Sequence, residues 1–197
     1  MNADFCRFGI EIEFADSISR YLSVGFRSRI NKELRPTFWT CGTDPTAELF
    51  NRQGEKTYYR AGLELRNSEP FKLSYAGIVF DELKALLSLA RELDCRPHKS
   101  CGVHIHFSFS REVIPSIADI ENELLRKYLR SVKDNRAKYC LDIGDLKYHP
   151  IRVVDPCESH YEARVFNGTL RIHAIRLYLN DLVSAINKHS KLESEIV

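Results

Sequence analysis

Apolar and polar residues alternate along four short stretches of the chain, and this period of two is typical of strands with one buried face. The stretches run from Phe8 to Phe14, Leu63 to Asn67, Gly102 to Phe109 and Tyr161 to Phe166. Strands that keep one polar face occur mostly in antiparallel sheets, because parallel sheets are covered on both faces. The pattern therefore predicts an antiparallel sheet.

Three longer stretches place apolar residues at a helical spacing: Leu73 to Leu93, Ile117 to Val132, and Ile172 to Leu192. A weaker helical pattern, interrupted by Gly25, runs from Ser17 to Leu34. Each of the three stronger helices is amphipathic, so we expect it to cover apolar surface. The chain is thus predicted to be α+β, with an antiparallel sheet and helices packed on one face.

The segment from Pro36 to Ala61 is rich in Thr, Gly, Asp, Asn and Pro, which predicts a long surface loop. Long loops on compact domains are often functional. Its aromatic residues are Phe38, Trp39, Tyr58 and Tyr59. They either line a substrate pocket or anchor the loop on the core, and the sequence favours neither interpretation.

Length and composition narrow the class of protein. A chain of 197 residues with 44% hydrophobic and 28% charged residues fits a single globular domain that covers residues 1–197. The 29 Lys and Arg against 27 Asp and Glu give a net charge of +2, so no nucleic-acid-binding face is expected. No apolar stretch reaches the roughly 20 residues of a membrane span, and the start of the chain lacks an apolar signal core, which predicts a cytoplasmic protein.

The six cysteines include no CxxC pair, so reduced thiols are expected. Cys95, His98 and Cys101 recur at every third residue, a spacing compatible with a structural zinc site, for which Cys157 and His160 could supply further ligands. Pro97 marks the same stretch as a turn between elements, which favours the interpretation without zinc.

The polar face of the predicted sheet can be read from the sequence, because side chains two apart on a strand point the same way. It carries four carboxylates, two imidazoles and two guanidiniums: Glu11, Glu13, Glu64, Arg66, His104, His106, Glu162 and Arg164. Taken singly, each pair also fits an ordinary exposed face or a cross-strand ion pair. None of the eight is Thr, Ser, Lys or Gln, which a generic exposed face would include.

The excess of carboxylates on this face favours a bound cation, because like charges within a few ångströms disfavour ionisation. Oxygen-rich ligation with one or two imidazoles suits Mg²⁺ or Mn²⁺ better than zinc. Guanidinium groups beside such a cation are what phosphoryl transfer requires, since they share the charge that develops on the phosphate.

Four segments of the chain, in this order, resemble the amidoligases of the carboxylate-amine ligase superfamily, which share a glutamine-synthetase-like fold. They are Gly9–Phe14 (GIEIEF), Gly62–Arg66 (GLELR), Cys101–His106 (CGVHIH) and Glu162–Thr169 (EARVFNGT). The resemblance covers most of the chain. It implies an ATP-dependent ligase, in which Mg²⁺-ATP phosphorylates a carboxylate and an amine displaces phosphate to form an amide or isopeptide bond. The partners would be a carboxylate and an amine substrate, each a small molecule, a peptide or a protein side chain.

The resemblance also implies how the metal ions would be held. Glu11 and Glu13 would divide between two Mg²⁺ ions, for which Mn²⁺ is an alternative. Glu64 would complete one site, and His104 with Glu162 would complete the other.

The nucleotide contacts follow from the same resemblance. Arg164 would hold the transferring phosphoryl group, while Arg66 and His106 would orient ligands or contact substrate. Asn167 lies in an expected strand-to-helix turn beside the site, where it would contact phosphate. The alternative is that this residue only forms the turn. The residues expected to be catalytic are Glu11, Glu162, Arg164 and Arg66.

Two other functions fit the same residues. A metal-dependent hydrolase or nuclease would use the carboxylates and imidazoles without nucleotide, but it explains the arginines less well. A non-catalytic relative would bind nucleotide or a partner, although loss of activity would be expected to remove at least one ligand position. The ligase is favoured because it accounts for all three kinds of side chain, while its substrates and oligomeric state stay open.

Overall fold

The structure is a computed structural model, and it describes residues 5–16, 26, 29–44, 62–97, 101–131 and 150–192. Several sequence-based expectations lie outside these residues. They are most of the Ser17 to Leu34 helix, residues 45–61 of the expected loop with Tyr58 and Tyr59, and His98 of the zinc spacing.

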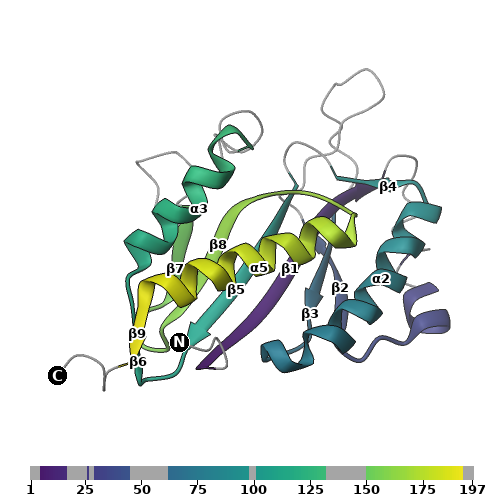
Figure 1. Cartoon of the computed structure of the whole chain (residues 1–197). Helices are drawn as coiled ribbons and strands as arrows, with labels where there is room; N and C mark the ends of the chain where they lie inside the picture. Colours follow the sequence, from purple (N-terminus) through teal and green to yellow (C-terminus); the bar gives the residue numbers. More distant parts are fainter. Residues whose placement is uncertain are drawn as a thin grey trace.

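The four alternating stretches form adjacent strands of one antiparallel sheet, as the pattern predicted (Figure 1). In chain order they are β1 (Cys6–Asp16), β3 (Gly62–Asn67), β5 (Gly102–Phe109) and β8 (His160–Asn167). Two edge strands, β2 (Trp39–Asp44) and β7 (Ile151–Asp155), extend the order to β2-β3-β1-β5-β8-β7. A short strand, β4 (Cys95–Arg96), pairs with the end of β1.

The three predicted amphipathic helices are present as α2 (Ala76–Glu92), α3 (Ile117–Ser131) and α5 (Ile172–His189). Figure 1 shows α5 crossing in front of the sheet, and α5 contacts both α2 and α3. The antiparallel sheet and its helices confirm the predicted α+β class. None of the helices in the described part of the chain is long and apolar enough to cross a membrane.

The apolar side chains of the strands pack against the helices in one continuous core. Its central members are fully buried: Phe8, Ile10, Ile12 and Phe14 of β1, Leu83 and Leu87 of α2, and Leu182 and Ile186 of α5. Each such side chain contributes about 1.5–3 kcal/mol when it leaves water. The helices therefore cover the apolar face of the sheet, and the opposite face is left to the polar side chains.

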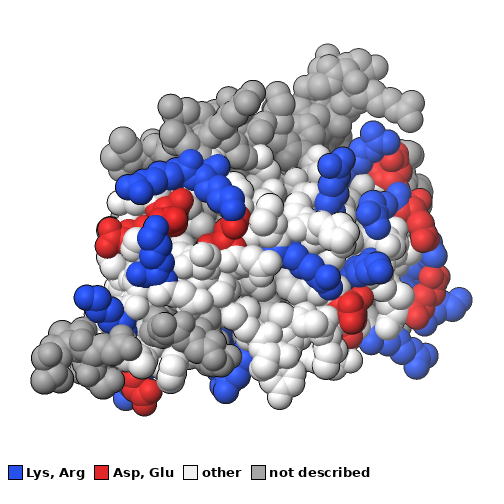
Figure 2. Space-filling view, viewed as in Figure 1, with Lys and Arg blue, Asp and Glu red and all other residues white. Residues whose placement is uncertain are grey.

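The helix side of the molecule carries charges of both signs over α2 and α3 (Figure 2). Ion pairs tie the helices together, since Lys127 of α3 is 2.5 Å from Asp181 of α5 and Lys188 of α5 is 2.7 Å from Glu123 of α3. The Tyr128 hydroxyl also donates to Asp181. These contacts hold α3 against α5. They thereby stabilise the helical layer that covers β8.

The expected loop from Pro36 to Ala61 is wrong at its start, where Trp39–Asp44 forms β2. Thr40, Gly42 and Thr43 obscure the alternation of apolar and polar residues in this strand. β2 is an edge strand paired with β3, and an edge strand tolerates such small residues. Trp39 is buried and donates from Nε1 to the Val79 carbonyl at 3.0 Å, so it anchors this segment on the core.

The last predicted helix is too long by three residues. It ends at His189, and Ser190–Leu192 forms β9, which pairs with β6 (Val113–Pro115). Inter-strand hydrogen bonds replace helical ones there, which a pattern of apolar positions does not reveal. The start of the first strong helix also differs: a 3-10 turn, η3 (Leu73–Tyr75), precedes α2. A π-helical turn, η2 (Ile30–Leu34), occupies the end of the weaker helical stretch.

Candidate functional site

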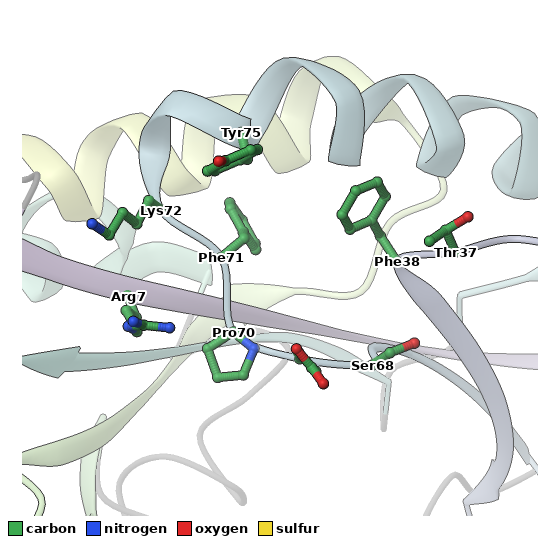
Figure 3. Close-up of a pocket in the computed structure, with 9 residues that line it drawn as sticks. Arg7, Thr37, Phe38, Ser68, Pro70, Phe71, Lys72 and Tyr75 are labelled. Carbon is green, nitrogen blue, oxygen red and sulfur yellow. The ribbon is translucent and has the colours of Figure 1, made fainter.

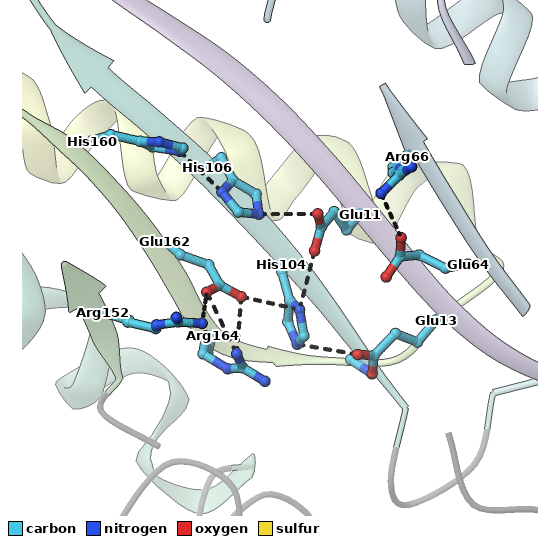
Figure 4. A network of polar contacts seen from close by, with 11 residues as sticks. Glu11, Glu13, Glu64, Arg66, His104, His106, Arg152, His160, Glu162 and Arg164 are labelled. Carbon is cyan, nitrogen blue, oxygen red and sulfur yellow. Dashed lines mark hydrogen bonds and ion pairs between the residues drawn. The ribbon is translucent and has the colours of Figure 1, made fainter. Parts of the chain in front are cut away.

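The strand register brings the predicted polar side chains onto one face of the sheet. Glu11 of β1 lies opposite Arg66 of β3 on one side and opposite His104 of β5 on the other. His106 of β5 lies opposite Glu162 of β8. Directly opposed residues of antiparallel strands point to the same face. Figure 4 shows these side chains together, with α5 behind the sheet, so the site lies on the face away from the helices.

His104 is the centre of this polar face and is nearly fully buried. Its Nδ1 atom is 3.2 Å from Oε1 of Glu162 and 3.6 Å from Oε2 of Glu11. Its Nε2 atom is 3.7 Å from Oε1 of Glu13. One imidazole thus separates three carboxylates, an arrangement that favours a further positive charge because buried carboxylates need compensation.

Glu11, His104 and Glu162 together form a candidate cation site. Each offers one donor atom, and the three atoms lie within 4.8 Å of one another. Mg²⁺ holds opposite ligands roughly 4.2 Å apart, twice its bond length of about 2.1 Å, so only a small side-chain shift is needed. Two carboxylates and one imidazole fit Mg²⁺ or Mn²⁺.

The other two expected metal ligands, Glu13 and Glu64, do not belong to this set of three donors. Glu13 is buried, and its Oε2 accepts a hydrogen bond from the Gly102 backbone amide at 2.6 Å. Glu64 is partly exposed, and its Oε1 is 4.0 Å from the Arg66 guanidinium. Among the residues that the structure describes, a second cluster of three such donors is not found.

Two guanidinium groups flank the Glu162 carboxylate. Arg164 NH1 donates to Oε1 of Glu162 at 3.1 Å, and the Arg164 side chain is largely buried. Arg66, which is not one of these two groups, is 60% exposed. Arg152 of β7, which lies opposite Glu162, places NH1 3.6 Å from Oε2. Glu162 is therefore shared between the candidate cation site and a pair of arginines that point to the same part of the face (Figure 4).

A bulge in β8 sets the direction of its last residues. The register shifts between Val103 and Ile105, so the strand β8 gains one residue against β5. Phe166 is thereby opposite Val103 and buried in the core, and Asn167 is opposite Gly102 on the polar face. Asn167 is the last residue of β8, whereas the sequence predicted that it lies in the turn that follows.

The electrostatics of the face favour an ionised Glu11. Burial alone would raise the pKa of this carboxyl, but hydrogen bonds and charge from His104 and His106 outweigh it and hold the pKa well below its usual range. His106 Nε2 is 3.3 Å from Glu11 Oε1. Burial would lower the pKa of His106, yet the Glu11 carboxylate outweighs it and raises that pKa. Glu11 is thus ready to act as an anionic ligand.

Sequence reasoning did not place two members on the face, Arg152 and His160, although it considered His160 as a further zinc ligand. His160 Nε2 is 3.1 Å from His106 Nδ1. The pKa of His160 is lowered, mainly by burial and to a lesser extent by the charge of the nearby His106. The period of two, continued from Glu162 back to residue 160, would have found this histidine. No comparable signal marks Arg152, because its short strand carries Val153 and Val154 in succession.

A cavity of about 230 Å³ opens on this face beside Glu11, and we call it the Glu11 pocket. It is lined by Gly9, Glu11, Arg66, His106 and His160, and by the Ser68–Pro70 segment. Gly9 lies opposite His106, and a Cβ there would stand 3.5 Å from the His106 Cβ, inside this space. The glycine therefore keeps the floor of the pocket open next to the candidate cation site.

The structure adds little support for zinc binding at the spacing of Cys95, His98 and Cys101. Cys95 and Cys101 are buried, and His98 lies outside the described residues. The interpretation without zinc, which the sequence favours, stays a prediction.

Comparisons with known proteins add no family to this description. No protein-family model matches the chain, and no curated protein resembles it significantly.

Proposed function

We propose that the chain is an ATP-dependent carboxylate-amine ligase with a glutamine-synthetase-like catalytic domain. The observation that carries the proposal is the meeting of Glu11, His104 and Glu162 on three adjacent strands, with Arg164 beside Glu162. Carboxylates, imidazole and guanidinium from distant parts of the chain thus surround one point. Ordinary ion pairs between strands on a solvated face do not require burial. Here, in contrast, Glu13, His104 and Glu162 are buried.

The reaction would proceed in two displacements. A carboxylate oxygen of the acid substrate attacks the γ-phosphorus of ATP, and ADP leaves. The amine nitrogen then attacks the acyl carbon, phosphate leaves, and the nitrogen gives up a proton. The first step is needed because a carboxylate is a poor electrophile, whereas a mixed anhydride has a good leaving group.

The chain's own residues would contribute binding and charge. Glu11, Glu162 and the Nδ1 atom of His104 would hold Mg²⁺ or Mn²⁺, which when bound neutralises charge on the phosphates. Arg164 would contact the transferring phosphoryl group, and Arg152 would supply a second guanidinium from the opposite side of Glu162. Glu13, fixed by the Gly102 amide, would keep the His104 ring in place through Nε2.

The remaining expected ligands have less defined positions. Arg66 and His106 line the Glu11 pocket, where they would contact substrate or phosphate. Asn167 would reach the site from the end of β8. A second metal ion, if it binds, would require Glu13 and Glu64 to leave their present partners.

The experiment is an assay for ADP formation with Mg²⁺ or Mn²⁺ over a broad panel of acids and amines. We expect ADP release that needs both an acid and an amine. Glu11→Gln and Glu162→Gln should abolish it while leaving the circular dichroism spectrum unchanged. Glu112→Gln, on an exposed turn, is the matched control and should keep full activity.

The outcomes separate the three functions. Turnover like the wild type in either site variant would refute the assignment. Bond cleavage with metal but without ATP would favour the hydrolase. Nucleotide binding without ADP release over the whole panel would favour the non-catalytic relative.

A further inference from the structure

A second and larger cavity, of about 570 Å³, is lined by Arg7 near the start of β1, by the residues just before β2 and by the segment that follows β3. We call it the Arg7 cavity. Figure 3 shows its residues around a common space, with Tyr75 and the helices above it and Ser68 and Pro70 below. Its volume is within the range of about 300–1,000 Å³ that is usual for small-molecule sites.

The walls of the Arg7 cavity combine aromatic rings with cations. Phe38, Phe71 and Tyr75 supply the apolar surface, and Arg7 and Lys72 lie at the same side of the space (Figure 3). Glu69 is the one acidic residue in the lining, so the cations are in excess. Tyr75 is 54% exposed, although its ring is large and apolar.

Hydrogen bonds hold these walls in place. The Glu82 carboxylate accepts from the backbone amides of Thr37 at 2.7 Å and Phe38 at 2.8 Å. Phe71 is fixed to β1, because its amide and carbonyl bond to those of Phe8 at 2.7 and 2.8 Å. The aromatic surface is therefore formed before any ligand arrives, which lowers the ordering cost of binding.

The two cations are available to a ligand. Within the described part of the chain, neither Arg7 nor Lys72 forms an ion pair, and both side chains are exposed. A carboxylate or phosphate placed between them would gain charge-assisted hydrogen bonds, while an attached ring would bury against Phe38, Phe71 and Tyr75. A neutral ligand would gain the second contribution alone.

We propose that the Arg7 cavity binds an anionic ligand with an aromatic body, and an aromatic carboxylate is the simplest case. The cavity shares Ser68–Pro70 with the Glu11 pocket, and Arg7 is four residues from Glu11 on the same side of β1. That separation is about 13 Å along a strand. The site is thus adjacent to, and distinct from, the cluster to which the ligase reaction is assigned.

The test measures binding alone, without nucleotide or metal, so its result does not depend on the ligase proposal. Ligand-observed NMR titrations compare 3-phenylpropionate with 3-phenylpropanamide, which lacks the charge, and with propionate, which lacks the ring. We expect 3-phenylpropionate to bind at least tenfold more tightly than either analogue. Tenfold corresponds to about 1.4 kcal/mol.

Variants place the binding in this cavity. The double substitution Arg7→Gln and Lys72→Gln should reduce the affinity for 3-phenylpropionate to that for the amide, and Tyr75→Ala should weaken both. Lys84→Gln, at an exposed position of α2, is the matched control and should change neither. All of these positions are exposed, so the fold is expected to tolerate the changes.

The proposal is overturned if the acid and the amide bind equally, or if the acid fails to bind at millimolar concentration. Full binding by the Arg7→Gln, Lys72→Gln protein would also overturn it, because the charge would then be recognised elsewhere. A ligase assay that fails leaves these measurements unaffected.

Discussion

Addition of Mn²⁺ should stabilise the folded chain, because its candidate ligands are already gathered. The donor atoms of Glu11, His104 and Glu162 lie within 4.8 Å of one another, whereas in the unfolded chain up to 151 positions of sequence separate them. A ligand that binds the folded state alone adds about 2.7 kcal/mol to the free energy of unfolding at 100 times its Kd. For a chain of this size, that corresponds to a rise in Tm of roughly 5–11 °C.

The assay is differential scanning calorimetry with and without MnCl₂, at an ionic strength held constant with NaCl so that surface screening does not contribute. Each variant is compared with itself, since Glu162→Gln also removes the partner of Arg164 and changes the starting Tm. We expect Glu11→Gln and Glu162→Gln to lose most of the Mn²⁺-dependent rise. Glu112→Gln, on an exposed turn, should keep it.

Two results would refute the reasoning. One is a wild-type Tm that does not respond to millimolar Mn²⁺. The other is a full response in both site variants, which would place the metal away from Glu11 and Glu162.

Three further predictions concern other parts of the fold. The Glu11 carboxylate outweighs burial and raises the pKa of His106 above 6.5, so the stability that this pair adds is complete below that pH and is lost as pH rises through the folded-state pKa. Urea denaturation should therefore show a larger cost of His106→Asn near about pH 6 than near about pH 8, and equal costs would contradict it. Cys157 is exposed, whereas burial raises the pKa of Cys6 to about 12; in the native protein, Cys157→Ser should remove a fast-reacting thiol and Cys6→Ser should not, as counted with a disulfide reagent. A Cβ at Gly168 would stand 2.8 Å from the Cys101 carbonyl oxygen, so Gly168→Ala should lower the free energy of unfolding by about 1–3 kcal/mol. Gly77→Ala, where the Cβ meets nothing within 4 Å, is its control and should not destabilise α2.

Much of the sheet and of the candidate site could be predicted from the sequence, because a period of two determines which side chains share a face. Glu11 and Glu13 had to point together, as did His104 and His106. Apolar residues on the other face of the same strands indicated where the helices would pack. The α+β class follows from these two observations.

The rest depends on pairings that leave no periodic trace. Strand β7 is too short and irregular to read, so Arg152 was not expected beside Glu162. The bulge in β8 reverses the alternation near Phe166, because the extra residue is accommodated by backbone geometry. The polar face was expected to be exposed, whereas Glu13, His104 and Glu162 are buried, which alternation within a strand does not report.

The central position of β1 has a consequence for synthesis of the protein. β1 is synthesised well before the strands that complete the site, because its neighbour β5 begins at Gly102 and the strand with Glu162 is completed only at Asn167. Contacts between such distant segments form slowly, since long loops must close first. A ribosome-bound chain that stops before β8 would therefore hold Glu11 and His104 without Glu162, and metal capture should begin only after β8 has been synthesised.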